Sequence, residues 1–336
     1  MEPKHPQKGP FVIDLCPGER IIGFFLVRRK QLEPFRDRSK GEFLTLILAD
    51  RTGQIVGRVW EGARELSETF ADKDVVKISA DVEEYLGHTQ LIVHKLRRAE
   101  ADEYDLTDFL PATDKDVAAM LASVQAAVAS IQEPNLAALV RHFYDDADFC
   151  ARLAQAPAAR RVHHAYLGGL LEHLVETLAL ADTVLEIYPQ INADLLRAGV
   201  LLHDIGKLRE YEWEKDIDYT HEGRLIGHVV LGVEMVTHAI ARRDDFPPEL
   251  SLRLRHMLIS HHGRYEWGAP RRPQTLEALV LHHIENLSAQ ANRFISILGA
   301  RREPGQVWTD YDRLLGRALY AGQQEDLSIE ERGHEE

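Results

Sequence analysis

The chain has 336 residues, of which 45% are hydrophobic, and a formal net charge of −14. This length exceeds what one hydrophobic core usually supports, so we expect two domains. No apolar run is long enough to span a membrane, and no signal-peptide core is evident, which predicts a cytoplasmic protein without a membrane partner. The two cysteines, Cys16 and Cys150, lie too far apart to form a disulfide framework or a cysteine zinc site.

The charge is distributed unevenly along the chain. Residues 20–98 contain 15 Lys or Arg against 12 Asp or Glu, a net charge of +3, so the remainder carries −17. An acidic protein is not expected to bind nucleic acid over its whole surface. The acidic part could hold a catalytic centre where metal ions offset the negative charge.

The first part of the chain has the pattern of a small β-barrel. Runs rich in β-formers alternate with turn signals such as "RTG" and "LGH". The predicted strands are residues 20–29, 42–50, 54–61, 74–86 and 89–98. Five short strands favour an OB-like barrel, whose open face commonly binds oligonucleotides.

Aromatic and basic side chains of this barrel are candidates for a strand-binding face, because OB-folds hold single strands by stacking and by backbone charge. The candidates are Phe24, Phe35, Trp60 and Tyr85, with Arg28, Arg29, Lys30, Arg58 and Lys95. Among them we select Arg28, Arg58 and Trp60 as substrate-binding residues. The alternative is that the aromatic rings belong to the core of the barrel.

Helical periodicity replaces the strand pattern from residue 117 to about residue 322, as in the runs 117–131 and 134–154. Pro111 to Asp116 is the predicted linker, with Thr113 or Asp114 as a helix N-cap. The acidic end is expected to be disordered. The predicted division is an OB-like domain over 1–112, an all-α domain over 113–322 and a tail over 323–336.

Histidines are concentrated in the helical part, where 12 of the 17 lie between His163 and His283. Several of them, with two carboxylates, interrupt apolar helices, where burial is costly unless the groups are paired or bind a cation. The candidate metal ligands are His173, His203, Asp204, His228, His261, His262 and Glu285. Isolated histidines such as His142 and His238 are interpreted as ordinary core or surface residues.

This set of side chains suits a two-metal site. Imidazoles and carboxylates bind Mn, Co, Fe, Ni, Zn or Mg, whereas a structural zinc site would favour thiolates. In the adjacent pair, His203 can bind one ion while Asp204 bridges to a second. Two ions can lower the pKa of a shared water toward about 7 and hold the oxygens of a phosphoryl centre. Lys207 is predicted to contact a phosphate oxygen, with a solvated surface lysine as the alternative, and Gly206 to let the helix end tightly.

Four motifs stand in a fixed order behind the predicted barrel. They are "HHAYLGGLLEH" from residue 163, "LLHDIGK" from 201, "SHHGRYEWGAP" from 260 and "IENLSAQ" from 284. Together they resemble the HD superfamily of metal-dependent phosphohydrolases. With a barrel in front, the chain is similar to the YhaM-type 3′→5′ exoribonucleases, which consist of an OB-fold followed by an HD domain.

The resemblance implies a divalent ion, typically Mn, and removal of nucleoside monophosphates from the 3′ end of single-stranded RNA, with single-stranded DNA as an alternative substrate. It implies His173, His203, Asp204 and Glu285 as one ligand set. It implies His228, His261 and His262 as the ligands of a second ion. Asp204 and Lys207 are the predicted catalytic residues. The pair His163 and His164 is assigned to the substrate phosphate or to support of the ligands.

One segment departs from the family pattern. Where the family usually has Asp-Asn-Leu-Asp-Ala-Lys, this chain has Glu285 followed by Asn, Leu, Ser288, Ala and Gln290. We expect altered metal affinity, rate or substrate choice, with the site retained. The competing hypotheses are an HD phosphohydrolase acting on nucleotides or cyclic nucleotides, and a nucleic-acid-binding protein with a decayed metal site. A homo-oligomer is a further expectation to test.

Overall fold

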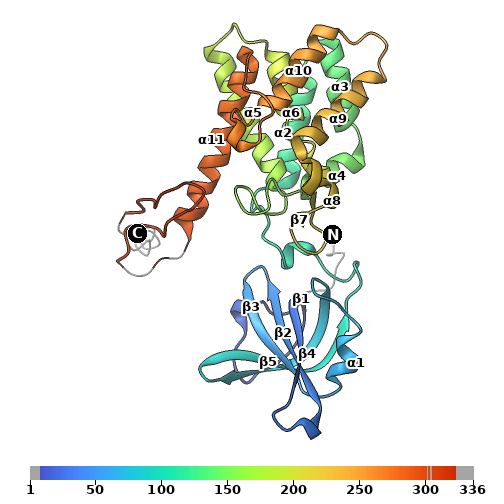
Figure 1. Ribbon diagram of the computed structural model, residues 1–336, viewed down its shortest axis with the longest axis vertical. Helices are drawn as coiled ribbons and strands as arrows, with labels where there is room; N and C mark the ends of the chain where they lie inside the picture. Colours follow the sequence, from blue (N-terminus) through green and yellow to red (C-terminus); the bar gives the residue numbers. More distant parts are fainter. Residues whose placement is uncertain (1–7, 301, 303–304, 323–336) are drawn as a thin grey trace, which may run out of the picture.

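We describe a computed structural model of the chain that covers residues 8–300, 302 and 305–322. A β-barrel forms one end of the molecule and a helical body forms the other (Figure 1). The last long helix extends away from the helical body and carries the C-terminal segment at its far end (Figure 1). Within the described residues, no helix is long and apolar enough to cross a membrane.

The barrel has the five strands that the sequence predicts. The strands are β1 (Arg20–Pro34), β2 (Glu42–Asp50), β3 (Gly53–Val59), β4 (Val75–Tyr85) and β5 (His88–Arg98), with the short helix α1 (Ala63–Ser67) between β3 and β4. They close in the order β1-β2-β3-β5-β4, and β3 pairs with β5 in parallel. Alternate residues of β2 point inward, so Leu44, Leu46 and Leu48 fill the barrel while Thr45 and Ile47 lie on its outer side. The predicted OB-like barrel is confirmed.

The helical body follows the predicted periodicity as far as residue 299. Its helices are α2 (Val117–Ser130), α3 (Pro134–Tyr144), α4 (Ala147–Gln155), α5 (Gly169–Ile187), α6 (Ala193–Leu202), α7 (Lys207–Glu210), α8 (His221–Ile226), α9 (His228–Ala241), α10 (Pro248–Ser260) and α11 (Leu276–Gly299). A two-stranded ribbon, β6 (Tyr211–Glu212) with β7 (Asp218–Tyr219), interrupts them. Short 3-10 turns occur at Val12–Asp14, Arg38–Lys40, Leu106–Asp108 and Tyr265–Trp267.

Three local predictions are corrected. The N-cap of α2 is Asp116, whose carboxylate accepts from two backbone amides, and not Thr113 or Asp114. The predicted run 134–154 divides into α3 and α4, because Asp146 caps a new helix. Helix does not continue to residue 322, since residues 305–322 contain only isolated β-bridges and the sequence has Pro304 and Gly305 after α11. The predicted tail, 323–336, lies outside the described residues.

The barrel and the helical body share a hydrophobic core. Phe24 and Leu26 of β1 and Val75 of β4 pack in one cluster with Phe109 and the helices. Phe24 is therefore a core residue and not a stacking platform, contrary to its candidate role. This continuity means that deleting the barrel would expose apolar surface of the helical body.

Ion pairs also cross the junction between the two parts. Arg28 of β1 lies 3.0 Å from Asp216, and Lys215 lies 2.7 Å from Asp74. Both partners in the helical body belong to the segment between β6 and β7, which faces the barrel (Figure 1). These contacts fix the orientation of the barrel relative to the helical body.

Gly206 permits a close approach between two helices that carry candidate site residues. Its backbone is helical, with φ −61°. The expectation that Gly206 ends a helix through a conformation that favours glycine is therefore wrong. A Cβ at this position would lie 2.0 Å from the carbonyl oxygen of His228 and 2.6 Å from the amide of Gly232. The absence of a side chain thus lets the first turn of α9 pack directly on the turn before α7.

We expect Gly206→Ala to lower the free energy of unfolding by about 1–3 kcal/mol or more, because α9 must move away. Gly299→Ala is the matched control, since a Cβ there meets nothing within 4 Å. Chemical denaturation of both variants measures the difference. Equal stability of Gly206→Ala and the wild type would contradict the close packing.

Candidate metal centre

Asp204 lies between two pairs of histidines. One of its carboxylate oxygens, Oδ2, is 3.3 Å from Nε2 of His203 and 3.7 Å from Nε2 of His173. The other oxygen, Oδ1, is 3.6 Å from Nε2 of His228 and 3.8 Å from Nε2 of His261. The four histidines come from or adjoin different helices, α5, α6, α9 and α10. The fold therefore brings together ligand candidates that lie far apart in the sequence.

Backbone carbonyls fix the tautomers of three of the rings. Nδ1 of His203 donates to Val200 O, Nδ1 of His261 to Leu258 O and Nδ1 of His262 to Trp267 O, at 2.7, 2.7 and 2.8 Å. A carbonyl oxygen only accepts, so Nδ1 must carry the proton in each ring. The lone pair of each ring is consequently on Nε2, the atom that faces the centre.

Several atoms of the centre are buried without a hydrogen-bond partner in the described part of the chain. They are Nε2 of His173, His203 and His261 and Oδ1 of Asp204. Buried acceptors that lack partners are costly, and a bound cation would remove that cost. The imidazole nitrogens and carboxylate oxygens also form the mixed donor set that divalent metals of the first transition row accept. The residues therefore fit a divalent cation.

The electrostatics of the centre favour ligands ready to bind a cation. Burial lowers the pKa of His173 and His261 well below the usual value and lowers the pKa of His262 to about 4, so these rings are neutral near pH 7. Burial opposes ionisation of Asp204, but the charge of Lys207 and the contact with His203 outweigh it, and the pKa of Asp204 lies well below its usual range. His203 is the exception: burial opposes its protonation, but the charge of Asp204 outweighs burial and raises the pKa of His203. A cation bound at Asp204 would offset that charge and favour the neutral ring.

His228 and His262 complete a second group of histidines with His261, whose ligand atoms all lie within 4.8 Å of one another. Nε2 of His228 is 3.3 Å from Nε2 of His262. The Glu210 carboxylate holds His228 twice, by its backbone amide at 3.0 Å and by Nδ1 at 3.0 Å. Sequence analysis did not identify Glu210, because no spacing rule links it to a residue 18 positions later.

His173 is positioned by side chains instead of a carbonyl. Ser288 donates its hydroxyl proton to Glu176 at 2.7 Å, so its oxygen must accept from Nδ1 of His173 at 2.9 Å. Burial disfavours the charge on Glu176, but hydrogen bonds from His164 and Ser288 outweigh it and lower the pKa of Glu176 to about 2. An ionised carboxylate thus orients His173 through a serine. The sequence indicated Ser288 only as a departure from the family pattern.

We expect Ser288→Ala to weaken Mn²⁺ binding by about 10-fold or more, because outer partners of metal-bound histidines contribute effects of that size. Glu176→Gln should have a smaller effect of the same kind, and the double variant should lose little beyond Ser288→Ala, since both act on one ring. Calorimetric titration with Mn²⁺ measures the affinities. Ser251→Ala is the control, because Ser251 is a buried serine on a different helix, α10. Unchanged affinity in Ser288→Ala would refute this role.

Lys207 and the pair His163 and His164 flank the centre. Nζ of Lys207 is buried and lies 2.6 Å from Oδ2 of Asp204, so the alternative of a solvated surface lysine is wrong. His163 is half-buried, and its ring centroid lies 5.3 Å from that of His173. His164 is fully buried, with Nε2 3.2 Å from Glu176, which favours the supporting role among the two alternatives for this pair.

Glu285 is buried on α11 but belongs to none of the three-residue ligand groups found among the described residues. Burial and the nearby charge of Asp204 raise the pKa of Glu285 to about 7. A cation near Asp204 would favour the ionised form of this carboxylate. Its metal role stays a prediction.

On the barrel, three aromatic rings form a cluster beside Arg58. The ring centroids of Phe35, Phe43 and Trp60 are separated by 5.1 to 5.9 Å, and the guanidinium of Arg58 lies 5.5 Å from the ring of Phe43. Trp60 is 42% exposed. Phe43 was missed by sequence analysis, although its place in the β2 alternation could have indicated it. The cluster offers apolar and cationic surface to a ligand.

Other candidates of the barrel lie elsewhere. Arg28 is engaged with Asp216 at the junction, which removes it from the aromatic cluster, and Lys30 donates to the carbonyls of Ser67 and Phe70. Arg29 and Tyr85 are exposed, Tyr85 at the end of β4. The substrate contact of Arg28 stays a prediction without support from its placement.

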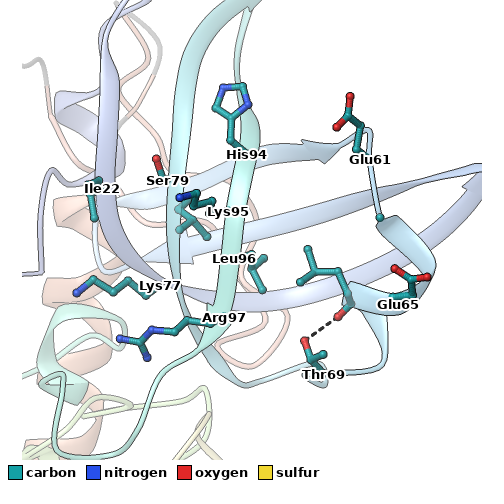
Figure 2. Close-up of a pocket in the computed structure, with 13 residues that line it drawn as sticks. Ile22, Glu61, Glu65, Thr69, Lys77, Ser79, His94, Lys95, Leu96 and Arg97 are labelled. Carbon is teal, nitrogen blue, oxygen red and sulfur yellow. Dashed lines mark hydrogen bonds between the residues drawn. The ribbon is translucent and has the colours of Figure 1, made fainter.

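Lys95 lines a separate groove of about 720 Å³ on the barrel (Figure 2). Lys77 and Arg97 lie with Lys95 along β4 and β5, and Glu61 and Glu65 lie on the side of α1 (Figure 2). Arg97 is already paired with Glu103. Because the groove carries both signs of charge, we assign no anion-binding role to it.

The barrel and the buried centre define the class of this protein. Residues 170–290 match the family model of the HD domain, and residues 26–99 match that of the OB-fold nucleic acid binding domain. The protein is a hydrolase with an HD domain, and that domain implies dependence on a divalent metal.

Curated relatives narrow the class to one family. The chain is 34% identical over 292 residues to the 3′-5′ exoribonuclease YhaM of Geobacillus sp. (strain WCH70). The aligned region covers 87% of this chain and 89% of the relative. It is 34% identical over 304 residues to the protein of the same name from Bacillus subtilis (strain 168), with coverage of 90% and 95%. The chain belongs to the YhaM family of 3′-5′ exoribonucleases.

Proposed function

We propose that the protein hydrolyses single-stranded RNA from its 3′ end to nucleoside monophosphates with the help of divalent metal, and that single-stranded DNA is a further substrate. The observation that supports this proposal best is the position of Asp204 between two pairs of histidines with unpartnered Nε2 atoms. The names of the curated relatives agree with it. In this proposal residues 1–112 bind the strand and residues 113–322 carry out hydrolysis.

The geometry supports two cation sites that share Asp204. We assign His173, His203 and Asp204 Oδ2 to one site, with Glu285 as a predicted fourth ligand. We assign Asp204 Oδ1, His228, His261 and His262 to the other. Mn²⁺ is our first choice, and Co, Fe, Ni, Zn and Mg are alternatives with the same donor preferences. When bound, two such ions polarise a phosphodiester and lower the pKa of water.

The remaining residues bind and orient the substrate. Lys207 is aimed at Asp204 from a buried position and is suited to contact a phosphate oxygen beside it. His163 is half-buried beside His173, with ring centroids 5.3 Å apart, and we keep the phosphate contact as its proposed role while His164 supports the ligands. The cluster of Phe35, Phe43, Arg58 and Trp60 would hold the strand by stacking and charge, which carries little base information.

A strand labelled at its 5′ end tests the proposal. With Mn²⁺, we expect a ladder that shortens from the 3′ end, release of nucleoside monophosphates, and slower shortening when the 3′ end carries a phosphate. Cleavage at internal positions would contradict the exonuclease mode. Binding without turnover at any Mn²⁺ concentration would favour a decayed site, and hydrolysis of nucleotides alone would favour a nucleotide phosphohydrolase.

A further inference from the structure

A loop rich in arginine and aromatic residues follows directly after the paired histidines. It contains Arg264, Tyr265, Trp267, Arg271 and Arg272, and is termed the arginine–aromatic lip. All five side chains are exposed, in contrast to the buried centre that precedes them. No role in metal binding or in the core accounts for this composition.

The lip is attached to the metal centre. The carbonyl oxygen of Trp267 accepts the hydrogen bond from Nδ1 of His262 at 2.8 Å. Backbone hydrogen bonds from Trp267 and Ala269 to Arg264 O, both 3.1 Å, close the turn, and Gly268 adopts a φ of +86° that favours glycine. The loop therefore has a defined conformation and is hydrogen-bonded directly to the candidate ligand His262.

Each aromatic ring of the lip has an arginine over it. The guanidinium of Arg264 lies 4.7 Å from the ring centroid of Trp267, and that of Arg272 lies 5.2 Å from the ring centroid of Tyr265. Tyr265 is 54% exposed and Trp267 is 45% exposed, so both residues leave surface open to a ligand. Aromatic rings and guanidinium planes are the groups on which proteins stack unpaired bases.

The lip is cationic, whereas the chain as a whole is acidic. Arg264, Arg271 and Arg272 form no ion pair with any acidic residue in the described ranges, and Glu266 is the one acidic residue between them in sequence. The whole chain carries −14. Three arginines without carboxylate partners at the edge of such a centre are complementary to phosphates.

We propose that the arginine–aromatic lip binds the nucleotides at the 3′ end of a single strand, with Trp267 and Tyr265 stacking on bases and the arginines contacting the adjacent phosphates. This inference rests on the proposed function and adds a binding site next to the centre, separate from the barrel. The lip would recognise the presence of a base and not its identity, because every base has a face that stacks.

The test combines a variant with a substrate that lacks one base. Two RNA strands are compared, identical except that one has an abasic residue at its 3′ terminus. Trp267→Ala should reduce kcat/KM on the complete strand by about 10-fold or more, the range of base–aromatic stacking, and change it little on the abasic strand. Trp267→Phe should keep most of the activity. Trp308→Ala, an exposed tryptophan of the C-terminal segment, is the control.

Two further measurements distinguish loss of strand binding by the lip from a structural effect of the substitution and from failure of the proposed function. The affinity for Mn²⁺ should be unchanged in Trp267→Ala, since the backbone carbonyl that holds His262 remains. Equal losses on both strands, or a weakened Mn²⁺ affinity, would overturn the proposal. Equilibrium binding of the two strands without turnover should show the same dependence on Trp267. This measurement therefore tests strand binding by the lip even if the wild type hydrolyses neither strand.

Discussion

Asp204→Asn should reduce the rate of RNA shortening by on the order of 10³-fold or more, because the two proposed cation sites would lose their shared carboxylate at once. In the proposed arrangement the neutral amide would be a poor shared ligand, and it cannot balance the charge of Lys207, which lies 2.6 Å from Asp204. Initial rates at saturating Mn²⁺ measure the loss, and calorimetric titration should show weaker binding of Mn²⁺.

Asp182→Asn is the matched control, since Asp182 is an exposed partner of Arg197 on the surface of α5. Its rate and its Mn²⁺ affinity should equal those of the wild type. Circular dichroism of both variants checks that the fold is retained, because Asp204→Asn leaves the Lys207 ammonium buried without its partner. A rate for Asp204→Asn within 10-fold of the wild type would refute the bridging role.

A double variant of the barrel, Arg58→Ala with Trp60→Ala, should weaken binding of a long strand by about 10- to 100-fold, because each stacked base and its cationic neighbour contribute about 1–3 kcal/mol. Hydrolysis of a small phosphodiester should be unchanged, since neither residue belongs to the centre in α5, α6, α9 and α10. Filter binding of the strand and a chromogenic diester assay measure the two effects.

Point variants test the barrel better than its deletion, because Phe24, Leu26 and Val75 pack in a core shared with the helices. Tyr188→Ala, an exposed aromatic residue at the end of α5, is the control and should leave strand binding unchanged. Loss of strand binding in the double variant with retained diester hydrolysis would support the nuclease over a nucleotide phosphohydrolase. Strand binding equal to the wild type would contradict a role for the aromatic cluster.

The sequence by itself determined the elements of the fold and the order of the motifs. The barrel strands β2 to β5 were predicted nearly to their ends, because alternation of apolar and polar residues is a local property of a sheet with one buried face. The first strand was predicted too short, since β1 continues past residue 29 to Pro34. Helical structure was predicted for the second part of the chain for the same reason, with a different period, but the β6–β7 ribbon and the end of helix at Gly299 were not. The candidate ligands could be named because an imidazole in an apolar helix requires a partner, whatever the surrounding fold.

Only the tertiary structure decided which partners each residue has. Asp204 meets His228 and His261 because α9 and α10 pack beside the end of α6, which no spacing along the chain reveals. Phe24 entered the shared core for a similar reason.

The same limit applies to the residues that support the centre. Ser288 reaches His173 across 115 positions and Glu210 reaches His228 across 18, so neither pair follows a helical or strand period. Gly206 has a helical backbone, so its conformation does not require glycine. Only the structure shows that a Cβ there would clash with the carbonyl oxygen of His228. Periodic burial can be predicted from residues that are close in the sequence, whereas hydrogen bonds between distant helices depend on how those helices pack.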